Sequence, residues 1–324
     1  MKTIIVYTLV STEKDIYLEQ AALSAYSVKK YSPNTKICLV VDNKTDMSII
    51  GNRNILLKYI DEKVVVNLSD EYTNAEKSRI LKTNLRNYVK GPYLFVDTDT
   101  IICAPLDNID ILLEKGVSLA AVKDGHSSFQ DMYFYELQIK RSKEIGWDLS
   151  KDTIHYNSGV MFVADNSLAH DFYNIWHENW LYERSKGFFY DQLALAHTNG
   201  MFNYPILTLG DEWNCQLEVD GLKYIANAKI LHLFGGYIDG NGFYFKNKRV
   251  YQFIKENGDF DKETLELLEN PKTAFLGHVT YLGNDEYYIR HSPIFTLFKY
   301  HKKEFYILEK ISNMYMNCRR NLKK

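Results

Sequence analysis

The stretch Tyr93-Leu94-Phe95-Val96-Asp97-Thr98-Asp99-Thr100-Ile101-Ile102 is an apolar run that two aspartates interrupt. Its first part, residues 93–96, predicts a strand buried on both faces, as in a parallel sheet. In an extended segment the side chains of alternate residues point the same way, so the carboxylates of Asp97 and Asp99 could share one cation. Mg²⁺ and Mn²⁺ prefer such oxygen ligands. The alternative is an aspartate-rich turn that only caps the next segment, but the position at a strand end favours a metal site.

Strands and helices alternate on both sides of this run, and Gly91-Pro92 ends the helix that precedes it. This alternation predicts an α/β fold with a mostly parallel central sheet and right-handed crossovers. Ligands bind beyond the carboxyl ends of the strands in such sheets, where Asp97 and Asp99 lie. The predicted strands are residues 4–9, 36–41, 64–68, 93–96, 117–122, 157–164, 224–225 and 230–233. The predicted helices are one that Ser11 or Thr12 caps and that stops before Pro33, residues 75–89, one that Asp165 or Asn166 opens, and residues 190–198.

Composition excludes several classes of protein. Of 324 residues, 46% are hydrophobic and 25% charged, as in ordinary globular proteins, and the formal net charge of −2 gives no sign of nucleic-acid binding. The four cysteines, at positions 38, 103, 215 and 318, have no zinc-site or disulfide spacing, which favours a reducing, cytoplasmic location. The N-terminal apolar run predicts a strand rather than a signal peptide, and no run reaches the roughly 18 apolar residues of a membrane span.

Four further elements carry groups suited to a binding site. The basic residues on the helix before residue 93 could line a binding site, or they could form an ordinary solvated helix face. A lone histidine can be an ordinary strand-end residue, and as a metal ligand it would have to be neutral. In chain order the elements are Arg79, with Lys77 and Lys82 as near alternatives, then Asn157-Ser158-Gly159, Asp191-Gln192, and His232 followed by Gly235.

In this order the motifs resemble the glycosyltransferases of the GT-A fold that use nucleotide-sugar donors. The resemblance is strongest to the retaining family eight, which contains glycogenin and bacterial lipopolysaccharide galactosyl- and glucosyltransferases, and it covers residues 1 to about 240. It implies that Asp97, Asp99 and His232 bind Mn²⁺ (or Mg²⁺), which bridges the donor's diphosphate. His232 would open an H-x-x-G element that ends at Gly235.

The resemblance also implies roles for the other motifs. Arg79 would contact the donor sugar and diphosphate, and Thr8, at the end of the first strand, would lie near the uracil. Asn157, Gly159 and Gly235 would complete the donor site. Asp191 and Gln192 would be the catalytic pair beside the anomeric carbon. The sequence departs from the family after Gly235, where a phosphate-binding lysine is absent and Lys246, Lys248 or Arg249 could replace it.

The implied fold is a GT-A (Rossmann-like) α/β domain over residues 1–243, followed over residues 244–324 by a helical, aromatic and basic extension. The implied activity is metal-dependent transfer of a hexose from a UDP-sugar to a saccharide or glycolipid acceptor, with retention. An inverting reaction would instead need a carboxylate base, for which Asp211 and Glu212 are the candidates. The basic tail could make peripheral contact with the inner face of a membrane, although a solvated helical cap explains it equally well.

Two rival functions stay open at this stage. A phosphatase of the haloacid dehalogenase type would use Asp97 as nucleophile and Asp99 as acid and base. It would leave Asn157, Asp191 and His232 without a role. A non-catalytic nucleotide-sugar-binding protein with the GT-A fold is the second rival, and the set of three metal ligands argues against it.

Overall fold

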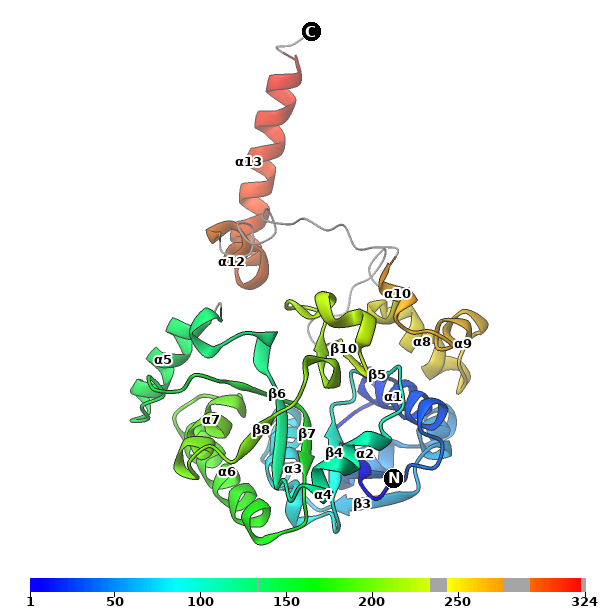
Figure 1. The fold of residues 1–324 in the computed structure, drawn as a ribbon. Coiled ribbons are helices and arrows are strands. Elements are labelled where there is room, and N and C mark those ends of the chain that lie inside the picture. Colours follow the sequence, from blue (N-terminus) through cyan, green and yellow to red (C-terminus); the bar gives the residue numbers. More distant parts are fainter. Residues whose placement is uncertain (133, 234–243, 277–291, 322–324) are drawn as a thin grey trace. The chain divides into compact units, whose positions relative to one another are not determined.

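The structure is a computed structural model that describes residues 1–132, 134–233, 244–276 and 292–321. The chain divides into two compact units, Met1–His278 and Val279–Lys324. The first unit contains a central seven-stranded sheet with the order β3-β2-β1-β4-β7-β6-β8 (Figure 1). Its strands are β1 (Ile4–Leu9), β2 (Ile37–Asp42), β3 (Glu62–Val66), β4 (Tyr93–Val96), β6 (Leu119–Lys123), β7 (Tyr156–Val163) and β8 (Ile206–Thr208).

The sheet is mostly parallel, as predicted, but β7 runs antiparallel to both of its neighbours, β4 and β6. This reversal matters for the site. Val96, the last residue of β4, pairs with Val160, and Asp97 N donates a hydrogen bond to Gly159 O at 2.8 Å. The start of β7 therefore lies at the same edge of the sheet as the end of β4.

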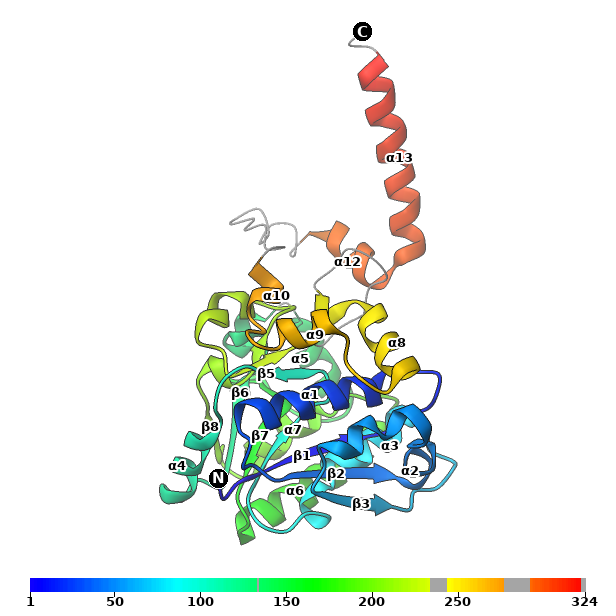
Figure 2. The ribbon, with the colours of Figure 1, turned by 90° about the vertical axis from the view of Figure 1, so that its right-hand side faces the viewer.

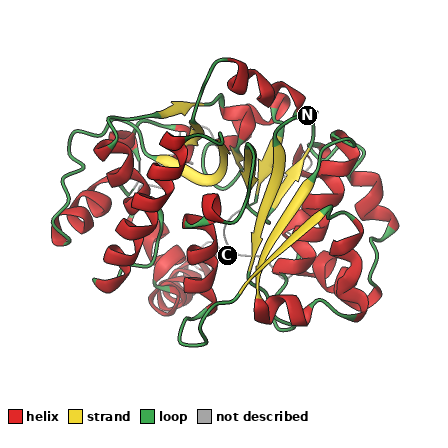
Figure 3. Cartoon of the chain, turned by 90° about the horizontal axis from the view of Figure 1, so that it is seen from below, coloured by secondary structure: helices red, strands yellow, loops and turns green. Residues whose placement is uncertain are grey.

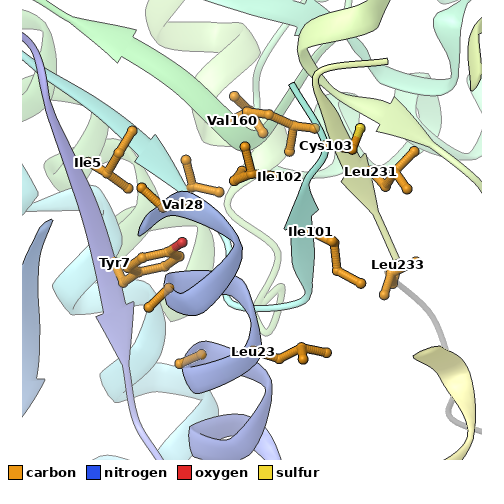
Figure 4. Close-up of a cluster of buried hydrophobic side chains, with 14 of the residues drawn as sticks. Ile5, Tyr7, Leu23, Val28, Ile101, Ile102, Cys103, Val160, Leu231 and Leu233 are labelled. Carbon is orange, nitrogen blue, oxygen red and sulfur yellow. The ribbon is translucent and has the colours of Figure 1, made fainter. Parts of the chain in front are cut away.

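Helices cover both faces of this sheet (Figure 3). Alternate residues of β1 point to opposite faces, because side chains of a strand alternate with period two. Ile5 and Tyr7 join the core beneath α1 (Tyr17–Tyr31), as Figure 4 shows. Val6 joins the core on the other face. That face is covered by α3 (Asn74–Thr83), α6 (Ser167–Ser185) and α7 (Gln192–Met201).

A second, three-stranded sheet has the order β5-β10-β9, with β5 over Thr100–Ile102, β9 over Cys215–Gln216 and β10 over Ile230–His232. β10 is antiparallel to β5, and its apolar residues pack beside Ile101 and Ile102 (Figure 4). Of the two late strands that the sequence predicts, the one at 230–233 is confirmed. The one at 224–225 is wrong, since these residues lie in a 3₁₀ turn, Gly221–Asn227.

Two predicted helices differ from those observed. The first begins at Tyr17 rather than after Ser11 or Thr12, because both hydroxyls donate hydrogen bonds to Asp15 and hold the segment in a turn. The helix predicted over 75–89 ends at Thr83 and continues as a 3₁₀ turn, Leu85–Asn87. The other described helices are α2 (Asn43–Ser48), α4 (Ile111–Glu114), α5 (Tyr135–Glu144), α8 (Lys248–Asn257), α9 (Lys262–Leu267), α10 (Thr273–Leu276), α12 (Pro293–Tyr300) and α13 (Lys302–Asn321).

Helix α8 and the segment after it pack within the first unit, near α1 (Figure 2). The ring of Phe260 contacts Tyr26 of α1, with centroids 5.1 Å apart, and Asn52 Nδ2 donates to Glu256 O. The compact unit thus extends to residue 278. The boundary after residue 243, which marks the end of the motifs, stays a prediction.

The second unit contains α12 and α13, which contact each other through Phe298 and Phe305, with ring centroids 5.2 Å apart. Along α13, Ile307, Ile311 and Met314 are exposed and follow one another at helical spacing. Among the helices in the described part of the chain, none combines the length and the apolar character that crossing a membrane requires.

Candidate metal and donor site

Asp97, Asp99 and His232 converge beyond the carboxyl end of β4. His232 Nε2 lies 3.3 Å from Asp99 Oδ1 and 4.0 Å from Asp97 Oδ2. One ligand atom from each residue lies within 4.8 Å of the other two. Strand pairing produces this arrangement, because His232 of β10 is in register with Thr100 of β5, and Leu233 N donates to Asp99 O at 2.8 Å.

The imidazole of His232 is buried and oriented by Asn214. Asn214 Nδ2 donates to Asn157 Oδ1 at 2.9 Å, so its Oδ1 is the atom that faces His232 Nδ1, also at 2.9 Å. Nδ1 therefore carries the proton and Nε2 faces the two aspartates. Burial is the largest single effect on the pKa of His232 and lowers it, but the charge of Asp99, its hydrogen bond and the charge of Asp97 together outweigh burial and raise this pKa. Burial is the largest single effect on the pKa of Asp99 and raises it, but the interactions with His232, a backbone hydrogen bond and the charge of Lys82 together lower this pKa.

Gly159 forms one wall of this cluster. A Cβ at this position would lie 2.3 Å from His232 Cε1 and 2.8 Å from Asp97 Oδ2, distances at which atoms overlap. Glycine is therefore required for the close approach of β7 to the ligands. The convergence of two carboxylates and an imidazole with a fixed tautomer fits a divalent cation such as Mn²⁺ or Mg²⁺.

A second charged cluster lies beside the first and centres on Asp191, which is buried. Arg79 Nε lies 3.0 Å from Asp191 Oδ1, and Ser158 Oγ donates to Asp191 Oδ2 at 2.7 Å. Lys82 Nζ lies 3.8 Å from Asp191 Oδ2 and donates to both oxygens of Asp97, at 3.1 and 3.2 Å. Burial raises the pKa of Asp191, but Lys82, Arg79 and the hydrogen bond from Ser158 outweigh it and lower this pKa to about 2.

Local structure holds the Asp191-Gln192 pair at the start of α7. Trp176 Nε1, on α6, donates to Asp191 O at 3.1 Å. Glu183, also on α6, accepts a hydrogen bond from Ala194 N at 3.0 Å and so satisfies one of the free N–H groups of the first turn of α7. The packing of two helices therefore positions Asp191 and Gln192, the pair for which the resemblance implies a catalytic role.

Asp124 is a site residue that the motifs did not reveal. It accepts hydrogen bonds from Asn157 Nδ2 at 2.9 Å and from Gln192 Nε2 at 3.2 Å. With Asn214 it completes a continuous hydrogen-bonded chain from His232 to Gln192. Asp124 directly follows the apolar strand β6, just as Asp97 follows β4, and this parallel is the signal that could have identified it. Asn214 has no such signal in the sequence.

The remaining predicted residues are less closely connected to the cluster. Thr8 lies in β1 two residues beyond Val6, which pairs with Phe95, so Thr8 and Asp97 stand at the same level of the sheet. Gly235 lies outside the described residues. Lys246, one alternative for the phosphate-binding lysine, is buried and paired with Glu218.

Comparison with known proteins supports the fold. The structure of the galactosyltransferase LgtC in complex with donor and acceptor sugar analogs has a TM-score of 0.51 at 16% identity, over 82% of this chain and 99% of that chain. An active-site mutant of LgtC has a TM-score of 0.51 at 15% identity, over 81% and 98%. Apo mouse xyloside xylosyltransferase 1 has a TM-score of 0.49 at 12% identity, over 72% and 98%. No protein-family model and no curated protein sequence matches the chain. The likeness to LgtC shows that this chain has the predicted GT-A fold.

Proposed function

We propose that this chain is a metal-dependent glycosyltransferase that moves a hexose from a UDP-sugar to a saccharide or glycolipid acceptor, with retention. The observation that carries the proposal is the junction of two clusters at one sheet edge. Asp97, Asp99 and His232 would hold a divalent cation, and Arg79 and Asp191 lie beside them. A metal site next to an ion pair suits a substrate that has both a diphosphate and hydroxyl groups.

In this proposal Asp97, Asp99 and His232 would hold a divalent cation, which would supply Lewis-acid stabilisation of the leaving diphosphate. Arg79 adds a fixed positive charge beside it. With a pKa of about 2, Asp191 is ionised at neutral pH, so it accepts hydrogen bonds from donor hydroxyls and does not supply a proton. The Gln192 amide donates to Asp124, which orients its carbonyl dipole for positive charge at the anomeric carbon.

Retention is the stereochemistry that we propose, and the contacts of Asp191 and Asp211 support it. An inverting reaction needs a carboxylate that is ready to take a proton from the acceptor. Asp191 is engaged with Arg79 and Ser158, and Asp211 Oδ1 lies 2.7 Å from His126 Nδ1. Analysis of the anomeric configuration of the product tests this part of the proposal.

The donor is tested by a thermal-shift series with nucleotide sugars, with and without Mn²⁺. A ligand that binds only the native state raises the unfolding temperature. UDP-sugars should raise it only when Mn²⁺ is present, and Asp99→Ala should abolish this shift together with release of UDP. Stabilisation by UDP-sugars that is equal without metal, or that persists in Asp99→Ala, would contradict the metal site.

The two rival functions predict different results in the same assays. In a phosphatase, Asp97 would have to attack a phosphate, yet both of its oxygens accept hydrogen bonds from Lys82. Turnover of p-nitrophenyl phosphate would favour that function. Binding of UDP-sugars with no release of UDP, for any acceptor and with water, would favour a non-catalytic binding protein.

We extend the proposal to a glycolipid acceptor and a peripheral membrane contact through α13. Ile307, Ile311 and Met314 are exposed on this helix, and Lys302, Lys303 and Arg319 add positive charge. Sedimentation with vesicles that contain anionic lipid should remove the protein from solution, whereas neutral vesicles should not. Equal amounts of protein in the supernatants of both kinds of vesicle would contradict the membrane contact and favour a soluble saccharide as the acceptor.

A further inference from the structure

Lys82 is a buried lysine at the junction of the two clusters. Its side chain is 5% exposed, and its Nζ donates to both oxygens of Asp97, at 3.1 and 3.2 Å. The same atom lies 3.8 Å from Asp191 Oδ2 and 4.9 Å from the centroid of the Phe95 ring. Lys82 thus joins a proposed metal ligand to a proposed donor-binding carboxylate.

This position follows from the helix that carries it. Arg79 and Lys82 are three residues apart on α3, so they lie on one face of the helix and both reach Asp191. Lys77 lies on the same helix and is equally buried, but it pairs with a different carboxylate, Asp42, at 3.1 Å. The chain therefore contains two buried lysines on one helix, of which one contacts the metal cluster.

Lys82 balances charge in the cluster without any bound metal. Asp97, Asp99 and Asp191 bring three carboxylates close together; Asp191 is buried and the other two are partly buried, and such groups are unstable without a compensating charge. The ammonium group of Lys82 offsets part of the repulsion among these carboxylates. It also occupies both oxygens of Asp97, which a bound metal ion would need as ligands.

We propose that Lys82 is a resident counter-ion that competes with the divalent cation for Asp97, so that metal binds weakly until a nucleoside diphosphate is present. This inference rests on the function proposed above. A divalent cation and an ammonium group that share one carboxylate repel each other, and this repulsion is stronger in a partly buried site than in bulk water. The diphosphate brings negative charge that compensates both cations. Metal and nucleotide therefore bind synergistically, and each strengthens the other by the same factor.

The test measures Mn²⁺ affinity of the full-length protein from the electron paramagnetic resonance signal of free Mn²⁺, with and without UDP. In the wild type, saturating UDP should strengthen Mn²⁺ binding by about tenfold or more. Lys82→Met, which removes the charge and keeps the length, should strengthen binding of Mn²⁺ alone by about tenfold and reduce the effect of UDP. Lys77→Met is the matched control and should leave the affinity for Mn²⁺ alone unchanged.

Two further variants keep the result decisive. Lys82→Arg retains the charge and should retain weak binding of Mn²⁺ alone. Lys82→Gln retains a hydrogen-bond donor without the charge and gives the same comparison if Lys82→Met does not fold. Unchanged or weaker Mn²⁺ binding in the uncharged variants would overturn the counter-ion role and leave the proposed function intact. Absence of Mn²⁺ binding in every protein, even with UDP, would overturn the proposed metal site itself.

Discussion

At the scale of single residues, Asn214 connects the two parts of the candidate site. Its carbonyl oxygen accepts a hydrogen bond from His232 Nδ1, and its amide nitrogen donates one to Asn157 Oδ1. A neutral side chain thus determines which nitrogen of the histidine faces the aspartates. Partners of this kind raise metal affinity because they fix the tautomer and orientation of the ligand.

Replacement of Asn214 tests this role. Asn214→Ala should weaken Mn²⁺ binding by roughly 10–100-fold, because the imidazole loses its orienting acceptor. Asn214→Asp should bind Mn²⁺ more tightly than Asn214→Ala, since a carboxylate still accepts from Nδ1. Isothermal titration calorimetry measures the Mn²⁺ affinity of both variants. The control is Asn227→Ala at an exposed position, and equal affinities of all three variants would contradict the role of Asn214.

Gly159 makes a steric prediction at the same scale. An added methyl group would overlap His232 Cε1 and Asp97 Oδ2, so Gly159→Ala must displace a proposed ligand. We expect Mn²⁺ binding to fall by more than about tenfold, as for loss of ligand orientation. Gly200→Ala, in α7, meets only Tyr204 Oη at 3.8 Å and should raise stability by roughly 0.5–1 kcal/mol. Calorimetric titration with Mn²⁺ tests Gly159→Ala, and thermal unfolding tests Gly200→Ala. Wild-type Mn²⁺ affinity in Gly159→Ala would contradict the predicted steric overlap.

At the scale of elements, the contact between α6 and α7 contains a buried carboxyl. Glu183 is fully buried, and one of its oxygens accepts from Ala194 N. Burial raises its pKa from an ordinary value of 4.5 to about 8. Folded protein therefore holds this proton over a range where the unfolded chain has released it. The stability that Glu183 contributes is complete below its unfolded pKa and is lost as the pH rises through about 8.

Glu183→Gln should remove this pH dependence, because glutamine keeps the acceptor for Ala194 and has no proton to lose. The unfolding temperature of Glu183→Gln minus that of the wild type should increase by roughly 4 °C or more as the pH rises from about 5 to about 8. Glu178→Gln, at an exposed position of the same helix, should show no such trend. Differential scanning calorimetry across this range provides the measurement. Parallel curves for wild type and Glu183→Gln would show that the carboxyl is already ionised in the folded state.

At the scale of the whole molecule, the extent of the first unit can be tested by truncation. Residues 244–276 add fully buried side chains such as Phe245, Tyr251 and Ile254, each of which contributes roughly 1.5–3 kcal/mol. A chain that ends at residue 278 should unfold cooperatively and keep the Mn²⁺-dependent response to UDP, whereas one that ends at residue 243 should not fold. Circular dichroism melting curves compare them. A stable 1–243 chain would instead support the boundary that the motifs indicated.

Much of the architecture could be predicted from local patterns. β1 and β4 have their predicted bounds, because continuous β-branched and apolar runs between turn residues are strong strand signals. The strand predicted at 224–225 is wrong, because two apolar residues within a 3₁₀ turn imitate a short strand. Strands β5, β8 and β9 were missed, since they have only two or three residues each and no periodicity.

The order of the motifs and the strand that precedes Asp97 follow from the sequence alone, because both depend on apolar runs and polar residues within a few positions. Tertiary structure decided that β7 runs antiparallel, which brings Asn157 to the same edge as Asp97. It also decided the register that places His232 beside Asp99, and the burial of Lys82 between two carboxylates. Register and burial depend on how distant segments pack around a shared core, and no short pattern in one segment contains that information.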